Sequence, residues 1–158
     1  MANTASLCTS FLGEMLTATH NFGVAPTRAT TAADTFKAAL YLTTGSIDAS
    51  TTAYTATGEV TGTNYSAGGV TVTNATVPAS TNSSATAGVG YWTPSASITY
   101  TNVTLITAFN AMLLYNSTQS NKAVGVYTFG SQTITAGTFA LTMPSNTTTT
   151  ALLRISTT

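Results

Sequence analysis

Only 5% of the 158 residues are charged, and about a quarter are threonine, whereas average soluble domains carry roughly 25% charged residues. Four acidic and four basic side chains cancel, so the chain has no field that would attract nucleic acid or an anionic membrane, and we expect neither partner. This composition argues against acid–base, metal and phosphate chemistry, while 43% hydrophobic residues argue against disorder.

The first segment has the apolar spacing of a helix. Hydrophobic side chains recur at intervals of three and four, which lines one helix face; they are Leu7, Cys8, Phe11, Leu12, Met15, Leu16 and Phe22. His20 falls near the expected C-terminus, and Gly23 comes where a left-handed residue commonly stops a helix. The pattern predicts an amphipathic helix over residues 1–22. A basic segment followed by an apolar run is missing, so we expect no secretory signal and synthesis in a cytoplasm.

The period then changes from helical to alternating. Residues 23–34 are predicted to form a loop around Pro26. In Phe36–Leu42 every second residue is apolar and Lys37 points the other way, which predicts a strand with one buried face. The glycine-punctuated stretch 59–69 has no phosphate-loop lysine and is predicted to be a loop with tight turns. Another strand is predicted over 70–73, and residues 78–88 are predicted to be a surface loop.

The second half of the chain predicts further short strands, separated by turn residues. They cover 89–93, 98–104, 105–115, 122–129, 138–143 and 151–155, with a polar hairpin connection after Asn116 and a turn at Ala136–Gly137. About eight short strands without intervening helices indicate an antiparallel all-β body. The expected fold is therefore mainly β: an N-terminal helix over 1–22, followed by one antiparallel β-sandwich domain over 23–158.

Catalytic groups are sparse and scattered. The one histidine, His20, has no nucleophile elbow to serve. The acids Glu14, Asp34, Asp48 and Glu59 are spread over the first 60 positions or so, and nothing in their spacing pairs them. Cys8 is the single cysteine, so no intrachain disulfide forms. We expect a protein that is not an enzyme, with no catalytic residue, no cofactor and no metal site.

Aromatic side chains are the candidate contact residues. Trp92, next to Pro94, is the first candidate for a partner surface, because tryptophan is enriched in the centres of interfaces. Tyr91, Tyr65 and Tyr54 are further candidates. The same residues leave open a carbohydrate-binding β module, in which sugars would stack on Trp92 and nearby tyrosines.

Three passages, in order along the chain, resemble a family of small virion proteins of tailed bacteriophages. They are Asp34–Leu42; Thr51–Tyr54 with Gly58–Gly69; and Leu114–Thr118 with Lys122–Ser131 and Thr135–Phe139. The resemblance implies a structural virion component without catalytic residues, and a capsid decoration (cement) protein is the leading hypothesis.

Under this hypothesis the chain binds the major capsid protein on the exterior of the assembled shell. It is made in the host cytoplasm and forms a homo-oligomer, for which a trimer is one candidate. A tail or adsorption-apparatus subunit is the alternative within the same class.

Overall fold

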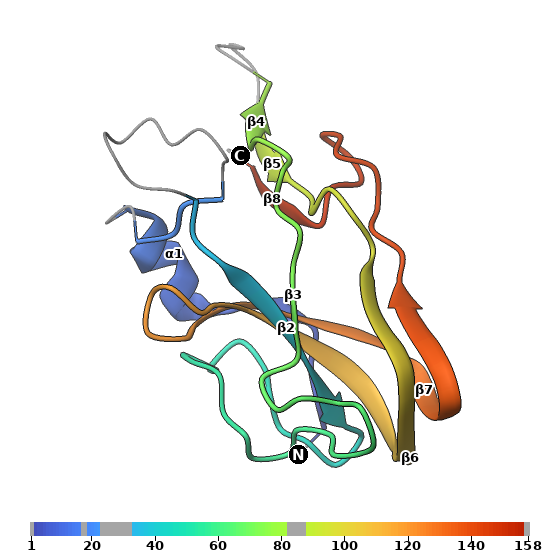
Figure 1. Cartoon of the computed structure of the whole chain (residues 1–158). Coiled ribbons are helices and arrows are strands. Elements are labelled where there is room, and N and C mark those ends of the chain that lie inside the picture. Colours follow the sequence, from blue (N-terminus) through green and yellow to red (C-terminus); the bar gives the residue numbers. More distant parts are fainter. Residues whose placement is uncertain (1, 17–18, 23–32, 82–87, 157–158) are drawn as a thin grey trace.

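The computed structural model describes residues 2–16, 19–22, 33–81 and 88–156 (Figure 1). In these residues the protein is mainly β, as predicted, with eight strands in two antiparallel sheets. The larger sheet has the order β1-β7-β6-β2-β3, and the smaller has the order β4-β5-β8. The elements are β1 (Ser6–Leu7), α1 (Thr9–Leu16), β2 (Phe36–Leu42), β3 (Val70–Thr71), β4 (Ala79–Ser80), β5 (Val89–Trp92), β6 (Ile98–Asn116), β7 (Lys122–Leu141) and β8 (Leu153–Ser156).

The N-terminal segment differs from the prediction of a helix over residues 1–22. Only eight residues form α1, and Ser6 and Leu7 instead pair with Val126 and Gly125 of β7. Pairing with the sheet edge holds this backbone extended and overrides the helical spacing of its side chains. Cys8, which links β1 to α1, is fully buried and donates its N–H to the Val124 carbonyl. The predicted stop at Gly23 and the loop positions up to residue 32 lie outside the described residues.

Strand β2 has the predicted bounds but is buried on both faces. Phe36, Ala38 and Leu40 are buried as expected, and Ala39 and Tyr41 on the opposite face are also fully buried. The prediction of a single buried face was wrong because the connection after β2 returns over it, so that the Tyr41 hydroxyl donates to the Thr55 carbonyl. At the other edge β3 lies close against β2. A Cβ on Gly69, whose φ is +70°, would meet the Ala38 carbonyl oxygen at 1.6 Å, so only glycine fits there.

Strands β6 and β7 form one long hairpin, whereas the sequence predicted four shorter strands. Asn102 and Ala136 have φ values of 53° and 45°, and the pairing register shifts next to both of them. The predicted turn at Ala136–Gly137 is therefore a bulge that bends β7 without ending it, and the predicted break between residues 104 and 105 adjoins another register shift within the continuous β6. Figure 1 shows the result: the hairpin turns sharply in its middle, and its two halves run in different directions.

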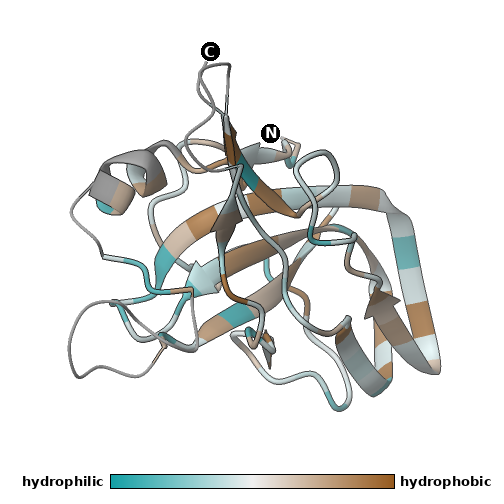
Figure 2. Ribbon diagram, turned by 90° about the horizontal axis from the view of Figure 1, so that it is seen from above, coloured by the Kyte–Doolittle hydropathy of each residue, from teal (hydrophilic) through white to brown (hydrophobic). Residues whose placement is uncertain are grey.

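The core of the described residues is one cluster that contains two larger groups of aromatic rings. One occupies the inside of the bent hairpin, where Phe109 and Phe139 meet edge to face with centroids 5.1 Å apart, beside Tyr100 and Phe129. The other joins the two sheets: Phe22 stacks on Phe36 of β2 at 4.4 Å and contacts Trp92 of β5 at 4.8 Å. Figure 2 shows hydrophobic positions distributed along the long strands. The small sheet is thus attached to the large one through stacked rings.

Candidate partner-contact surface

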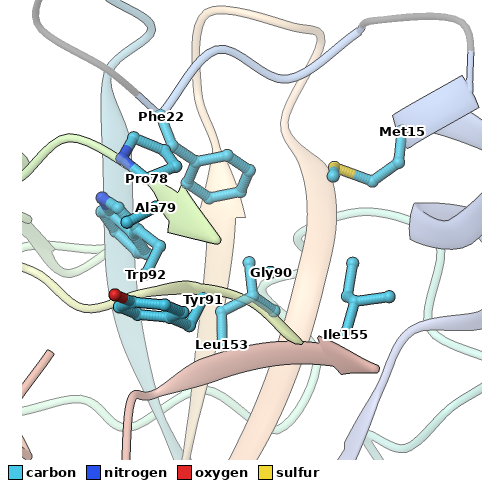
Figure 3. A pocket seen from close by; sticks show the side chains of 9 residues that line it. All are labelled: Met15, Phe22, Pro78, Ala79, Gly90, Tyr91, Trp92, Leu153 and Ile155. Atoms are coloured by element: carbon cyan, nitrogen blue, oxygen red, sulfur yellow. The ribbon is translucent and has the colours of Figure 1, made fainter. Parts of the chain in front are cut away.

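An apolar pocket lies between α1 and the small sheet. Nine residues line it: Met15, Phe22, Pro78, Ala79, Gly90, Tyr91, Trp92, Leu153 and Ile155. It has a volume of about 120 Å³ and is open to solvent. Figure 3 shows Pro78 and Trp92 on one side, Met15 on the other, and Leu153 with Ile155 along the base. The pocket therefore offers a partner an almost wholly hydrocarbon surface.

The hollow exists because one position of the small sheet has no side chain. Trp92 pairs with Leu153 and Gly90 pairs with Ile155, so these positions project from one face of the sheet. A Cβ on Gly90 would have Ile155 O, at 3.8 Å, as its nearest neighbour. The space above Ile155 is thus empty because Gly90 does not fill it.

Exposed hydrophobic side chains gather at the same place. The large hydrophobic residues exposed in the described part of the chain are Met15, Val77, Ile106 and Ile155. Met15 and Ile155 line the pocket, and Val77 precedes its Pro78. Single exposed hydrophobic residues are ordinary, but a contiguous group around a hollow is typical of an interaction site.

Two of the four predicted contact residues belong to this pocket. Trp92 is only 2% exposed; its Nε1–H donates to the Thr76 carbonyl at 2.9 Å, and its ring packs against Phe22 and Phe36. Tyr91, half-buried, lines the same pocket. Trp92 therefore supports one wall of the pocket and does not present a free ring to a ligand.

Tyr54 and Tyr65, the other two predicted contact residues, lie elsewhere and hold a buried carboxylate. Tyr54 donates its hydroxyl to Glu59 Oε2 at 2.6 Å, and Tyr65 donates to Oε1 at 2.7 Å. The Gly68 N–H donates to Oε1 at 2.8 Å. Burial and the bond to Glu59 raise the pKa of Tyr54 to about 12 and also raise the pKa of Tyr65. This cluster was not predicted: the tyrosines lie five residues before and six after Glu59, and that spacing alone does not show that their rings turn inward.

A second polar cluster joins the end of α1 to the β6–β7 turn. Glu14 accepts from Lys122 Nζ at 2.6 Å and contacts His20 Nε2 at 2.8 Å. Burial alone would raise the pKa of Glu14, but the bonds from Lys122 and His20 outweigh it and lower that pKa. Asn116, fully buried, bridges His20 Nδ1 at 3.1 Å and Asp34 Oδ2 at 2.7 Å. The predicted role of His20 as a helix-end residue was therefore incomplete, because its ring belongs to a buried network.

The remaining acidic side chain, Asp48, accepts hydrogen bonds from the N–H and the hydroxyl of Ser50. Each of the four acidic side chains therefore accepts hydrogen bonds from within the chain. Arg154 is the exposed charged residue of the described ranges. No group of three or more metal-ligating side chains occurs in the part of the chain described.

No protein-family model, curated protein or solved structure matches this chain. Within the described residues, no helix is long and apolar enough to cross a membrane.

Proposed function

We propose that the chain is a capsid decoration protein, a β-sandwich subunit that binds an assembled phage shell and bridges its major capsid subunits. The class of assembly is suggested by the resemblance to small virion proteins described above. The observation that carries the proposal is the surface: acidic groups are bonded within the fold, while Met15 and Ile155 are exposed in the lining of an apolar pocket. Interface centres have this character, depleted of charge and rich in hydrophobic side chains.

The mechanism is binding linkage. A ligand that binds only the assembled lattice stabilises it by RT ln(1 + [L]/Kd) at each site. Many copies on one shell then resist the pressure of the packaged genome. Shell stabilisation by binding needs no chemical step. This fits a chain whose carboxylates and single histidine make hydrogen bonds within the fold.

Salt titration of capsid binding tests this proposal. Purified protein is added to undecorated capsids, and the bound fraction is measured by co-sedimentation from 50 mM to 500 mM NaCl. Because apolar contacts are not screened, we expect the bound fraction to change by less than about twofold over this range. Arg154→Gln, which removes an exposed charge, serves as a control and should bind equally. Loss of binding at moderate salt, or no binding at any salt, would contradict the proposal.

A tail subunit would share this surface, but it would be present in a few copies at one vertex. Electron microscopy of the intact particle separates the two locations by counting copies. The carbohydrate-binding alternative is not supported by the surface, because Trp92 is only 2% exposed and its ring packs against Phe22 and Phe36.

A further inference from the structure

Ile106 is the most exposed large hydrophobic side chain of the described residues, at 77%. It lies in a bulge of β6: Leu105 pairs with Ile134 and Phe109 with Gln132, so four steps along β6 oppose two along β7. Leu105 and Phe109 on either side are fully buried, while Ile106 and Thr107 stay exposed. The bulge thus presents an isoleucine outward as a knob.

The same chain carries a hollow of matching chemistry and size. The pocket at Gly90 and Trp92 has a volume of about 120 Å³ and an apolar lining. An apolar cavity of about 150 Å³ holds benzene, with six carbons. The four-carbon side chain of isoleucine therefore fits the pocket, and its branched Cβ complements the gap that Gly90 leaves above Ile155.

We propose that the pocket receives Ile106 of a second copy of this chain. This inference rests on the proposed function, because it identifies which part of a second copy binds the apolar pocket when the protein forms a homo-oligomer. Figure 1 places the hairpin bend and the small sheet at opposite ends of the molecule, so the knob of one copy and the pocket of the next make a head-to-tail contact. Such contacts close into a ring or extend as a row.

Both contact surfaces are uncharged and apolar, as a contact between two copies of this chain requires. Neither the bulge at Ile106 nor the pocket lining contains a charged residue, so two copies approach without like-charge repulsion. Burying Ile106, Met15 and Ile155 together removes three of the exposed hydrophobic side chains from water at once. Desolvation of apolar surface is the main driving force of association between uncharged surfaces.

Complementation between two variants tests the contact. Ile106→Thr removes the knob at an exposed position and keeps the branched Cβ. Gly90→Val fills the pocket from within, where a Cβ finds open space. For the wild type we expect oligomers by light scattering coupled to size exclusion. For each variant alone we expect a monomer, with self-association weakened by about thirtyfold or more, as for a hot-spot residue.

Mixing the two variants gives the decisive result. The Gly90→Val chain keeps its knob and the Ile106→Thr chain keeps its pocket, so one contact forms, and the mixture should contain 1:1 dimers and nothing larger. Thr107→Ser, next to the knob, is the matched control and should behave as wild type. A monomeric wild type, unchanged oligomers in either variant, or no dimer in the mixture would overturn the inference.

This assay uses the isolated chain, so it is independent of capsid binding. If Ile106→Thr, which leaves the pocket intact, loses self-association and still co-sediments with capsids, the proposed function stands and its avidity is reduced. If the wild type self-associates through Ile106 yet never binds capsids, the proposed function fails while the contact between copies stands.

Discussion

The protein holds two carboxylates in contrasting ways. Glu59, 7% exposed, is held by two tyrosine hydroxyls and one backbone N–H, all of them uncharged donors. Glu14 is held by Lys122, whose side chain is 38% exposed, and by His20. The first cluster consists of uncharged hydrogen-bond donors around a buried carboxylate, whereas the second contains an ion pair that is partly exposed to solvent.

The contrast between the Glu59 and Glu14 clusters indicates where this nearly uncharged chain gains stability from polar groups. Buried hydrogen bonds to a charged acceptor are unscreened, and a donor left without its acceptor costs about 1–3 kcal/mol. Exposed ion pairs are screened by salt and contribute about 0–1 kcal/mol. We therefore expect the Glu59 cluster to dominate the polar contribution and to be insensitive to salt.

Glu59→Leu should have the largest effect. The substitution leaves the Tyr54 hydroxyl, the Tyr65 hydroxyl and the Gly68 N–H without their acceptor, so the free energy of unfolding should fall by about 3 kcal/mol or more. Urea denaturation measures it. Glu59→Gln keeps one acceptor oxygen and should lose less. A fall below about 1 kcal/mol for Glu59→Leu would show that the two clusters are equivalent.

The second-largest effect is expected at alkaline pH, which should reduce the stability that the Glu59 cluster contributes. The pKa of Tyr54 is about 12 in the folded protein, against an ordinary value of 10.0. Since the folded state holds this proton more tightly, the stability it contributes is complete below pH 10 and is lost as the pH rises toward 12. Thermal unfolding between pH 8 and 12 measures the decline. Other buried tyrosines with raised pKa values add to this decline, so Tyr54→Phe should make it less steep, and Tyr91→Phe, outside the cluster, should not. Equal profiles in both variants would refute the assignment.

Lys122→Gln should have the smallest effect. It removes one partner of Glu14 at a half-exposed position, so we expect a loss of about 0.5–1 kcal/mol at low salt. In 1 M NaCl the difference from wild type should nearly vanish, because the Debye length falls to about 3 Å. Urea midpoints at the two salt concentrations give both numbers. A loss that persists in high salt would place Glu14 with Glu59 among the buried clusters.

The sequence was informative where local rules decide the structure. Phe36–Leu42 was predicted with its bounds because its alternation is regular, and the hairpin connection after Asn116 was predicted because its residues are polar. Local rules failed at Ala136, where a turn was predicted and a left-handed residue instead bends a strand that continues. They failed again at Ser6 and Leu7, where pairing with β7 prevailed over helical spacing.

The candidate site was predicted in part for the same reason. Trp92 and Tyr91 were selected for their residue type and do line the pocket. Met15 and Ile155 are far apart in the chain, and only the tertiary fold brings them into the lining of one pocket. Nothing local to Glu59 shows that Tyr54 and Tyr65 turn inward, so their structural role depends on the returning connection.

The burial of Cys8 makes its thiol an intrinsic reporter of the N-terminal segment. Burial, followed by the nearby charges of Asp48 and Glu14, raises the pKa of the Cys8 thiol to about 11. A thiolate is the reactive form, so an alkylating reagent reacts only after β1 separates from β7 and water reaches the sulfur. The rate of labelling therefore tracks how often that edge opens, without any added probe and with a single modification to count.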